Sequence, residues 1–243
     1  MSQFIVVLAY PRTGSSLCMQ TLKLLGAHVA GEAKRPDLDI DGNPKGYYED
    51  MRVLGKGLNA QIINEYQAIK AHNIAFKLSY APLHPNHKRT TPEQQVAFLK
   101  QLSPRFILTV REPLESIMSV QRWSDSTCPK EQFIRITQKL KKYKENIETI
   151  LKVLHDNHWL NPNNCLVQNY HDAIQNPTAY VERLADFAGL APSHEQIASA
   201  RANIDPALFR YKAKTLPANV VDWDSKIGAS ATYERLIQPL LIR

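Results

Sequence analysis

A cation, a glycine and several hydroxyl groups lie together in residues 11–17, Pro-Arg-Thr-Gly-Ser-Ser-Leu. The segment follows an apolar run, Phe4–Tyr10, that predicts a buried strand, and it precedes a helical pattern that ends near Gly26. In a strand–loop–helix unit of this kind, backbone N–H groups and the positive end of the helix dipole hold an anion. Arg12 adds a full positive charge. The sequence therefore predicts an anion site at this loop, against the plain alternative of a tight turn without a ligand.

The loop can also be compared with the P-loop pattern G-x-x-x-x-G-K-[ST] of ATP-binding proteins. Ala9 stands at the first glycine, Ser15 at the lysine and Ser16 at the hydroxyl position. Loss of the lysine removes the group that reaches the β- and γ-phosphates, which disfavours an ordinary ATPase or kinase. Two alternatives stay open: a small-molecule or nucleotide kinase with a degenerate P-loop, and a module that binds a phosphorylated nucleotide or nucleic acid without chemistry.

With its cation inside the loop, the segment resembles the 5′-phosphosulfate loop of the sulfotransferases, Pro-[Lys/Arg]-[Ser/Thr]-Gly-[Ser/Thr]-[Ser/Thr]. These enzymes transfer a sulfuryl group in line from 3′-phosphoadenosine 5′-phosphosulfate (PAPS) and release 3′-phosphoadenosine 5′-phosphate (PAP). The resemblance implies that Arg12 stabilises the leaving oxygen, that the loop hydroxyls donate hydrogen bonds and that no metal is needed. The nucleotide-binding residues that it implies here are Arg12, Thr13, Gly14, Ser15, Ser16 and Leu17.

A second anion site is expected after the strand predicted over 105–110, where an Arg-x-Pro sequence beginning at Arg111 precedes Ser119. Ligands of open parallel sheets bind beyond the carboxyl ends of strands, and an arginine with a hydroxyl can hold a phosphate. The segment resembles the part of the sulfotransferases in which arginine and serine hold the ribose 3′-phosphate of PAPS. The alternative is a structural arginine at a helix start, paired with Glu112 or Glu115.

The general base that removes the acceptor's proton is expected to be Glu49, by similarity to the glutamate bases of other sulfotransferases. Its segment, Asn43–Asp50, looks like the Gly-x-x-Glu segment of bacterial members of the family. The alternative is a structural carboxylate that caps a helix start or pairs with Lys45 or Arg52.

Three more side chains are candidates near the transferred group: Lys77, His84 and His87. The histidines follow the strand predicted over 74–78 and are second candidates for the base, against the alternative of exposed loop histidines. Lys77 either faces the sulfonate or extends its ammonium group into solvent.

The late segment 169–190 also carries the resemblance: Asn-Tyr-His-Asp looks like the family's Tyr-Glu-Asp-Leu, and Phe-Ala-Gly-Leu looks like its helix end Leu-Gly-Leu. The resemblance covers most of residues 4–190. Beyond it, Asp222–Gly228 does not match the Arg-x-Gly-x-x-Gly-x-Trp-Lys segment that closes over the nucleotide in cytosolic sulfotransferases. The cations that complete the 3′-phosphate pocket are therefore open, with three candidates: Arg210, Lys212 and Lys226.

The elements that position these residues alternate along the chain. Besides the N-terminal strand, strands are predicted over Ile74–Leu78, Arg105–Val110 and Cys165–Tyr170, and helices follow capping signals at Thr91, Asn176 and Ser193. Alternating strands and helices predict βαβ units and a mainly parallel sheet. We expect an α/β fold with a central parallel sheet flanked by helices, similar to the P-loop NTPase-like sulfotransferases, in one domain over residues 1–243.

The net charge of +7 over 243 residues fits an anionic partner, such as a nucleotide, a nucleic acid or a membrane surface. The densest basic run, Lys139–Lys144, is explained by the solvated face of a helix, so no nucleic-acid partner is expected. No apolar run predicts a transmembrane segment or a signal peptide. The three cysteines lack metal-ligand spacing and predict a reducing, cytoplasmic location.

Together these patterns predict an enzyme that moves a sulfuryl group from PAPS to a hydroxyl or amine of a small-molecule, sugar or lipid acceptor. Segments 30–66, 79–92 and 122–135 are expected to line the acceptor's entrance, because loops carry specificity on such scaffolds. Neither the identity of the acceptor nor the oligomeric state follows from the sequence.

Overall fold

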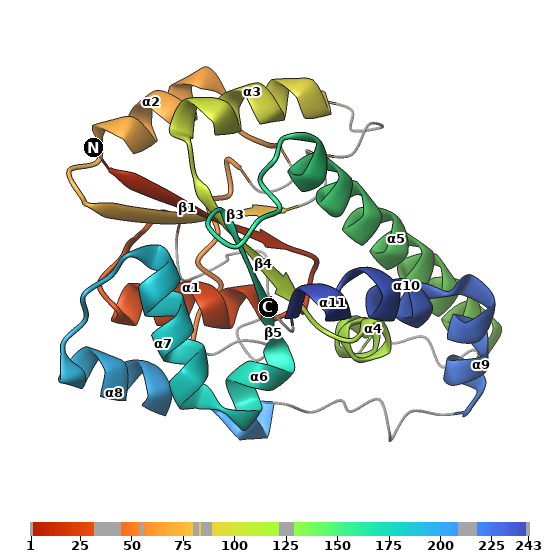
Figure 1. Ribbon diagram of the computed structural model, residues 1–243. Helices are drawn as coiled ribbons and strands as arrows, with labels where there is room; N and C mark the ends of the chain where they lie inside the picture. Colours follow the sequence, from red (N-terminus) through yellow and green to blue (C-terminus); the bar gives the residue numbers. More distant parts are fainter. Residues whose placement is uncertain are drawn as a thin grey trace.

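A computed structural model describes residues 2–31, 45–53, 56–79, 83, 89–121, 129–208 and 218–241. The expected parallel sheet is confirmed, with the strand order β2–β3–β1–β4–β5 and every neighbouring pair parallel (Figure 1). The strands are β1 Gln3–Ala9, β2 His28–Val29, β3 Asn73–Ser79, β4 Arg105–Val110 and β5 Cys165–Asn169. Sequence patterns did not predict β2, because two residues are too few to show a strand period.

The helices that were predicted from capping signals are confirmed. Thr91 and Ser193 each form a capping box, and the Asn176 side chain accepts a hydrogen bond from the backbone N–H of Ala179. The described helices are α1 Ser15–Leu24, α2 Ala60–Ala68, α3 Pro92–Leu102, α4 Pro113–Gln121, α5 Pro129–Asp156, α6 Tyr170–Gln175, α7 Pro177–Ala188, α8 His194–Ala202, α9 Ala218–Ile227, α10 Ala229–Leu236 and α11 Gln238–Leu241. Of these, α2, α6 and α9 to α11 were not predicted from the sequence; the strand expected over 165–170 includes Tyr170, which instead begins α6.

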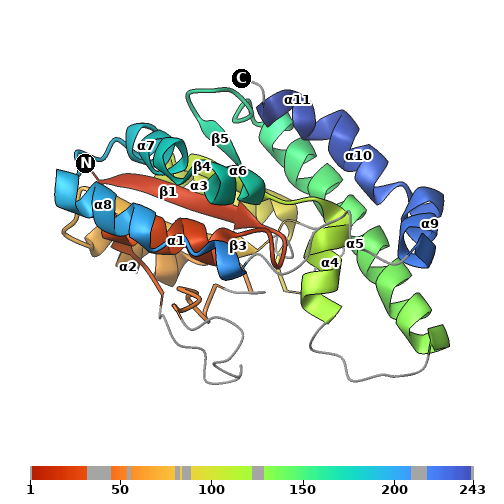
Figure 2. The same cartoon turned by 90° about the horizontal axis from the view of Figure 1, so that it is seen from below.

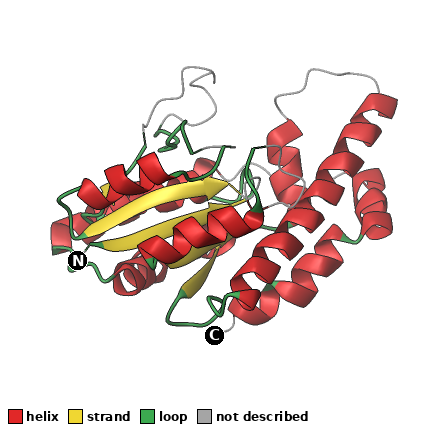
Figure 3. Cartoon of the chain, turned by 90° about the horizontal axis from the view of Figure 1, so that it is seen from above, coloured by secondary structure: helices red, strands yellow, loops and turns green. Residues whose placement is uncertain are grey.

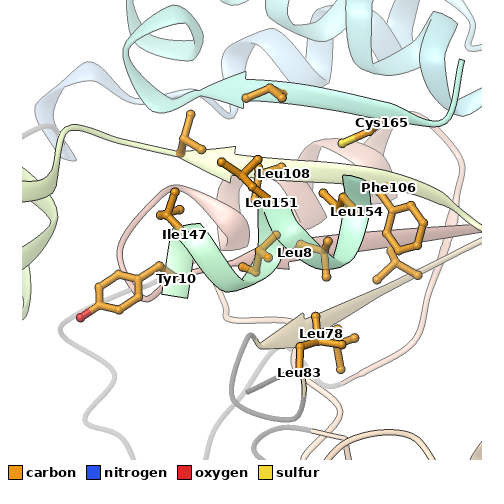
Figure 4. Packing of buried hydrophobic residues seen from close by; sticks show 14 of the residues in the cluster. Leu8, Tyr10, Leu78, Leu83, Phe106, Leu108, Ile147, Leu151, Leu154 and Cys165 are labelled. Atoms are coloured by element: carbon orange, nitrogen blue, oxygen red, sulfur yellow. The ribbon is translucent and has the colours of Figure 1, made fainter. Parts of the chain in front are cut away.

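Side chains of β1 alternate between the two faces of the sheet, as the period of a strand requires. Val6 and Leu8 lie in one buried core, which includes residues of α2, α5 and the C-terminal helices; Figure 4 shows Leu8 beside Leu151 of α5. Ile5 and Val7 lie in the opposite core with residues of α1, α7 and α8. Helices therefore cover both faces of the sheet (Figures 2 and 3).

The parallel register brings the carboxyl ends of the central strands to one edge of the sheet. Ala9 of β1 is paired with Ser79 of β3 and Thr109 of β4, and Val110 is paired with Asn169 of β5. The segments that follow β1, β4 and β5 consequently start side by side. These are the segments in which the sequence predicted the functional residues.

The C-terminal helices (blue in Figure 1) extend the face that α5 covers. Both α9 and α10 contact α4 and α5, and α11 contacts β5. Lys141 and Lys142 are exposed on α5, as expected for a solvated helix face. Among the residues that the structure describes, no helix combines the length and the apolar character needed to cross a membrane.

Candidate active site

The loop between β1 and α1 adopts backbone conformations that favour glycine. Gly14, the N-cap of α1, has φ 95°, and Arg12 also has a positive φ of 70°. Among the described side chains, none caps the start of α1. The N–H groups of the first turn, from Ser15 onward, therefore lie at the positive end of the helix dipole, and no described side chain caps them. Such a helix start suits an anion.

Gly14 is also required by a close neighbour. A Cβ atom at this position would lie 2.7 Å from Cδ2 of Tyr170, the first residue of α6. A side chain would thus collide with the aromatic ring in addition to straining the backbone. The loop after β1 and the start of α6 can pack together only because residue 14 has no side chain.

We expect Gly14→Ala to lower the free energy of unfolding by about 2–4 kcal/mol. Alanine in the left-handed backbone conformation is strained, and its Cβ atom would also collide with Tyr170, so both effects destabilise the folded state. Gly228→Ala is the matched control: Gly228 has φ 73° and caps α10, but no described atom lies within 4 Å of its would-be Cβ. Urea unfolding of both variants measures the difference. Equal losses would show that the contact with Tyr170 does not matter.

Thr13 faces the protein interior. Its side chain is buried, its hydroxyl donates to the carbonyl of Tyr10 at 2.8 Å, and it lies 2.9 Å from the hydroxyl of Thr109 on β4. The expectation that this hydroxyl donates to a ligand is therefore corrected: the group ties the loop to β4. A binding role for Thr13 depends on its backbone N–H.

Lys77 of β3 links the loop to the predicted base. Its ammonium group donates to Ser16 Oγ at 3.2 Å, to Glu49 Oε1 at 3.0 Å and to the carbonyl of Tyr47 at 2.8 Å. The Lys77 side chain is 4% exposed and that of Glu49 12% exposed. The alternative in which Lys77 extends into solvent is therefore wrong. The sequence offered no sign of this contact, because strand lysines in general reach either way.

The structural partners that the sequence suggested for Glu49 are engaged elsewhere. Lys45 donates to the carbonyl of Asn203 at 2.6 Å, and Arg52 forms its ion pairs with Asp50 and Glu65. Glu49 thus forms its ion pair with the buried Lys77, within reach of the loop. The other candidates for the base, His84 and His87, lie outside the described residues, as do Asn43 and Pro44.

Arg111, directly after β4, is held on several sides. Its Nε donates to Glu115 Oε2 at 3.1 Å, and its guanidinium lies 4.8 Å from the centre of the Tyr170 ring. The Tyr143 hydroxyl donates to its backbone carbonyl at 2.7 Å. The suggested pairing with Glu115 is therefore confirmed. A guanidinium has five N–H donors, so this bond alone does not exclude phosphate binding.

Ser119 of α4 joins the two predicted anion sites. It is 6% exposed, and its Oγ accepts a hydrogen bond from Arg12 Nε at 3.0 Å. The residues are 107 positions apart in the chain. The structure thus brings the loop after β1 and the Arg-x-Pro segment after β4 into direct contact, at one edge of the sheet.

Tyr170 is the site residue to which sequence reasoning gave no separate role. Its ring lies against Gly14 and under Arg111. Burial raises the pKa of its phenol, and the charges of Arg111 and Arg12 oppose that rise. Its place directly after β5, in the segment 169–172, was the available signal, since the carboxyl ends of parallel strands share an edge.

The other predicted residues are placed as follows. Ser15, Ser16 and Leu17 form the first turn of α1, and Ser15 is 8% exposed. Lys226 is exposed on α9 and pairs with Asp222 at 2.9 Å. Arg210 and Lys212 lie outside the described residues. Of the three candidate cations for the second anion site, only Lys226 is therefore described, and it forms an ion pair within its own helix.

The model of the Sulfotransferase family matches residues 4–195, which include both anion sites. The chain belongs to the sulfotransferase family. The resemblance inferred from the loop and from the Arg-x-Pro segment is thereby confirmed, and the family assignment supports a transferase of the sulfotransferase type. Residues 196–243, with helices α9 to α11, fall outside the match.

Solved structures show the same fold at low sequence identity. The sulfotransferase STF9 from Mycobacterium avium is 14% identical, with a TM-score of 0.60 over 98% of this chain and 76% of that one. Mouse sulfotransferase SULT7A1, complexed with PAP, is 13% identical, with a TM-score of 0.57 over 96% and 85%. A retinol dehydratase in complex with retinol and PAP is 14% identical, with a TM-score of 0.52 over 99% and 82%. No curated protein sequence matches this chain.

Proposed function

We propose that this chain transfers the sulfuryl group of PAPS to a hydroxyl or amine of a small-molecule, sugar or lipid acceptor. The observation that carries the proposal is the hydrogen bond between Arg12 and Ser119, because it joins a loop suited to the phosphosulfate to a segment suited to the 3′-phosphate. Solved relatives of this fold that contain PAP support the choice of nucleotide.

The residues present fit this nucleotide at both ends. The start of α1, with Arg12 beside it and Lys77 bonded to Ser16, offers N–H groups and cations for the 5′ end. Arg111 and Ser119 offer a guanidinium and a hydroxyl for the 3′-phosphate. An anion held between fixed donors needs little rearrangement of the protein, which is the basis of electrostatic catalysis.

The bound nucleotide supplies the sulfuryl group, whose bond to a phosphate oxygen breaks as the acceptor's oxygen or nitrogen bonds to sulfur. Arg12 stabilises the negative charge that develops on the leaving oxygen. Glu49 accepts the acceptor's proton. Lys77 keeps the Glu49 carboxylate beside the loop by binding Oε1.

Calorimetric titration with PAP and with adenosine 5′-phosphate tests the nucleotide site. We expect PAP to bind about 30-fold more tightly or better, because only PAP carries the phosphate that Arg111 and Ser119 would hold. Equal affinities would refute the 3′-phosphate role of both residues. Turnover of ATP that requires Mg²⁺, without PAP binding, would instead favour the degenerate kinase.

We expect Glu49→Gln to lower kcat about 100-fold or more with PAP affinity nearly unchanged, because the amide cannot accept the acceptor's proton. Glu65→Gln is the control, since Glu65 is 41% exposed and pairs with Arg52. Steady-state kinetics with the acceptor varied separates kcat from KM. An unchanged kcat in the Glu49 variant would assign the proton transfer to another group.

Three further expectations stay proposals. Residues 1–243 form one domain, transfer needs no metal, and the protein is cytoplasmic. The last is supported by Cys18 and Cys165, which are buried and form no disulfide. Cys128 lies outside the described residues, and so do parts of the segments expected to line the acceptor's entrance.

A further inference from the structure

At the second anion site, a guanidinium and an imidazole both contact the same oxygen atom of a carboxylate. Glu115 Oε2 accepts from Arg111 Nε at 3.1 Å and lies 2.8 Å from Nε2 of His171, the second residue of α6. The side chains of Arg111 and Glu115 are 5% and 2% exposed, whereas that of His171 is 32% exposed. With a neutral imidazole, the carboxylate offsets the charge of Arg111, so the trio has no net charge to offer a phosphate.

We propose that His171 determines specificity for the 3′-phosphate by taking up a proton when this phosphate binds, an inference that rests on the nucleotide site proposed above. Arg111 Nε and His171 Nε2 lie within about 6 Å of each other, because both reach the same oxygen. An anion bound by Arg111 favours the charged form of a nearby imidazole. Histidine is the side chain that changes charge between about pH 5 and 8. Its protonation gives the trio one net positive charge.

Charged groups of both signs lie near His171. Its carboxylate neighbours among the described residues include Glu115 of α4, at 2.8 Å, and Asp172, the next residue in the chain. Asp172 is itself paired with Arg183 of α7 at 3.4 Å. The cationic neighbours of His171 include Arg111, whose Nε donates to the same Glu115 oxygen.

Tyr233 of α10 is affected by the same carboxylates. Burial, followed by the charges of Glu112, Asp172 and Glu115, raises the pKa of the Tyr233 phenol, so this group stays neutral at physiological pH. Tyr233 therefore does not compete with His171 for a proton at this pH.

Proton uptake on nucleotide binding tests the inference with the full-length protein. PAP and adenosine 5′-phosphate are titrated into wild type and His171→Gln by calorimetry, in buffers that differ in ionisation enthalpy. The 3′-phosphate exchanges protons itself, so the difference between the two proteins reports His171. We expect wild type to take up more protons with PAP than the variant, and equal uptake with adenosine 5′-phosphate.

Affinity gives a second readout. At about pH 6.5 His171→Gln should bind PAP about tenfold more weakly than wild type, since it lacks one charge-assisted contact, and this gap should close by about pH 8.5. Affinity for adenosine 5′-phosphate should not change. His155→Gln is the matched control: His155 also faces a carboxylate, Asp156 at 3.4 Å, but at the far end of α5.

The outcomes separate this inference from the function on which it rests. Tighter binding of PAP than of adenosine 5′-phosphate, with identical proton uptake in wild type and variant, overturns the role of His171 and leaves the nucleotide site intact. Equal affinity of wild type for the two nucleotides overturns both. If His171→Gln does not fold, His171→Asn takes its place in the same titrations, and proton uptake identical to that of wild type overturns the inference.

Discussion

Arg12→Ala should lower kcat about 100- to 1000-fold while PAP affinity falls by less than about tenfold, because the guanidinium acts mainly on charge that develops during transfer. Arg12 already has a positive φ of 70°, and alanine keeps the Cβ atom that makes this conformation costly. The substitution thus removes the guanidinium and its bond to Ser119 without changing the backbone strain. Single-turnover transfer and PAP titration measure the two effects separately.

Arg12→Lys is the control for this experiment, because it keeps the charge and the family's loop pattern accepts either cation. We expect it to retain most of the turnover. If Arg12→Ala lowers PAP affinity as strongly as it lowers turnover, Arg12 stabilises the bound nucleotide and the transition state equally. This result would refute the catalytic role of Arg12.

Arg111→Ala should weaken PAP binding by about 2–4 kcal/mol, or about 30- to 1000-fold, with affinity for adenosine 5′-phosphate changed by about twofold or less. The reason is burial: Arg111 is 4% exposed, so hydrogen bonds from its guanidinium to a phosphate face little competition from water. The variant also leaves the buried Glu115 carboxylate without its guanidinium, so we expect a lower unfolding temperature in the absence of nucleotide.

Arg105→Ala is the matched control for Arg111→Ala. Arg105 begins the same strand, and its guanidinium lies 5.7 Å from the centre of the Phe187 ring, but it stands at the opposite end of β4. Calorimetry should find that the Arg105→Ala variant binds both nucleotides with the affinity of the wild type. If Arg111→Ala weakens both nucleotides equally, the residue supports the fold of the site and does not hold the 3′-phosphate.

Most of the sheet could be predicted, because each strand shows its own apolar pattern. The strands that begin at Phe4, Ile74, Arg105 and Cys165 were expected within one residue of their observed starts. Helices with capping signals were expected for the same local reason. The helices of the C-terminal part were not, because contacts with α4 and α5 surround them and no local signal marked them.

The sequence by itself determined the family and the position of the two anion-binding segments, because glycine, hydroxyl and cation must be neighbours in the chain to form such a loop. Only the tertiary structure decided which groups meet. Lys77 reaches Glu49 across 28 positions, and His171 reaches Glu115 across 56. Those contacts depend on the order of the strands in the sheet, and residue spacing along the chain does not encode that order in any local pattern.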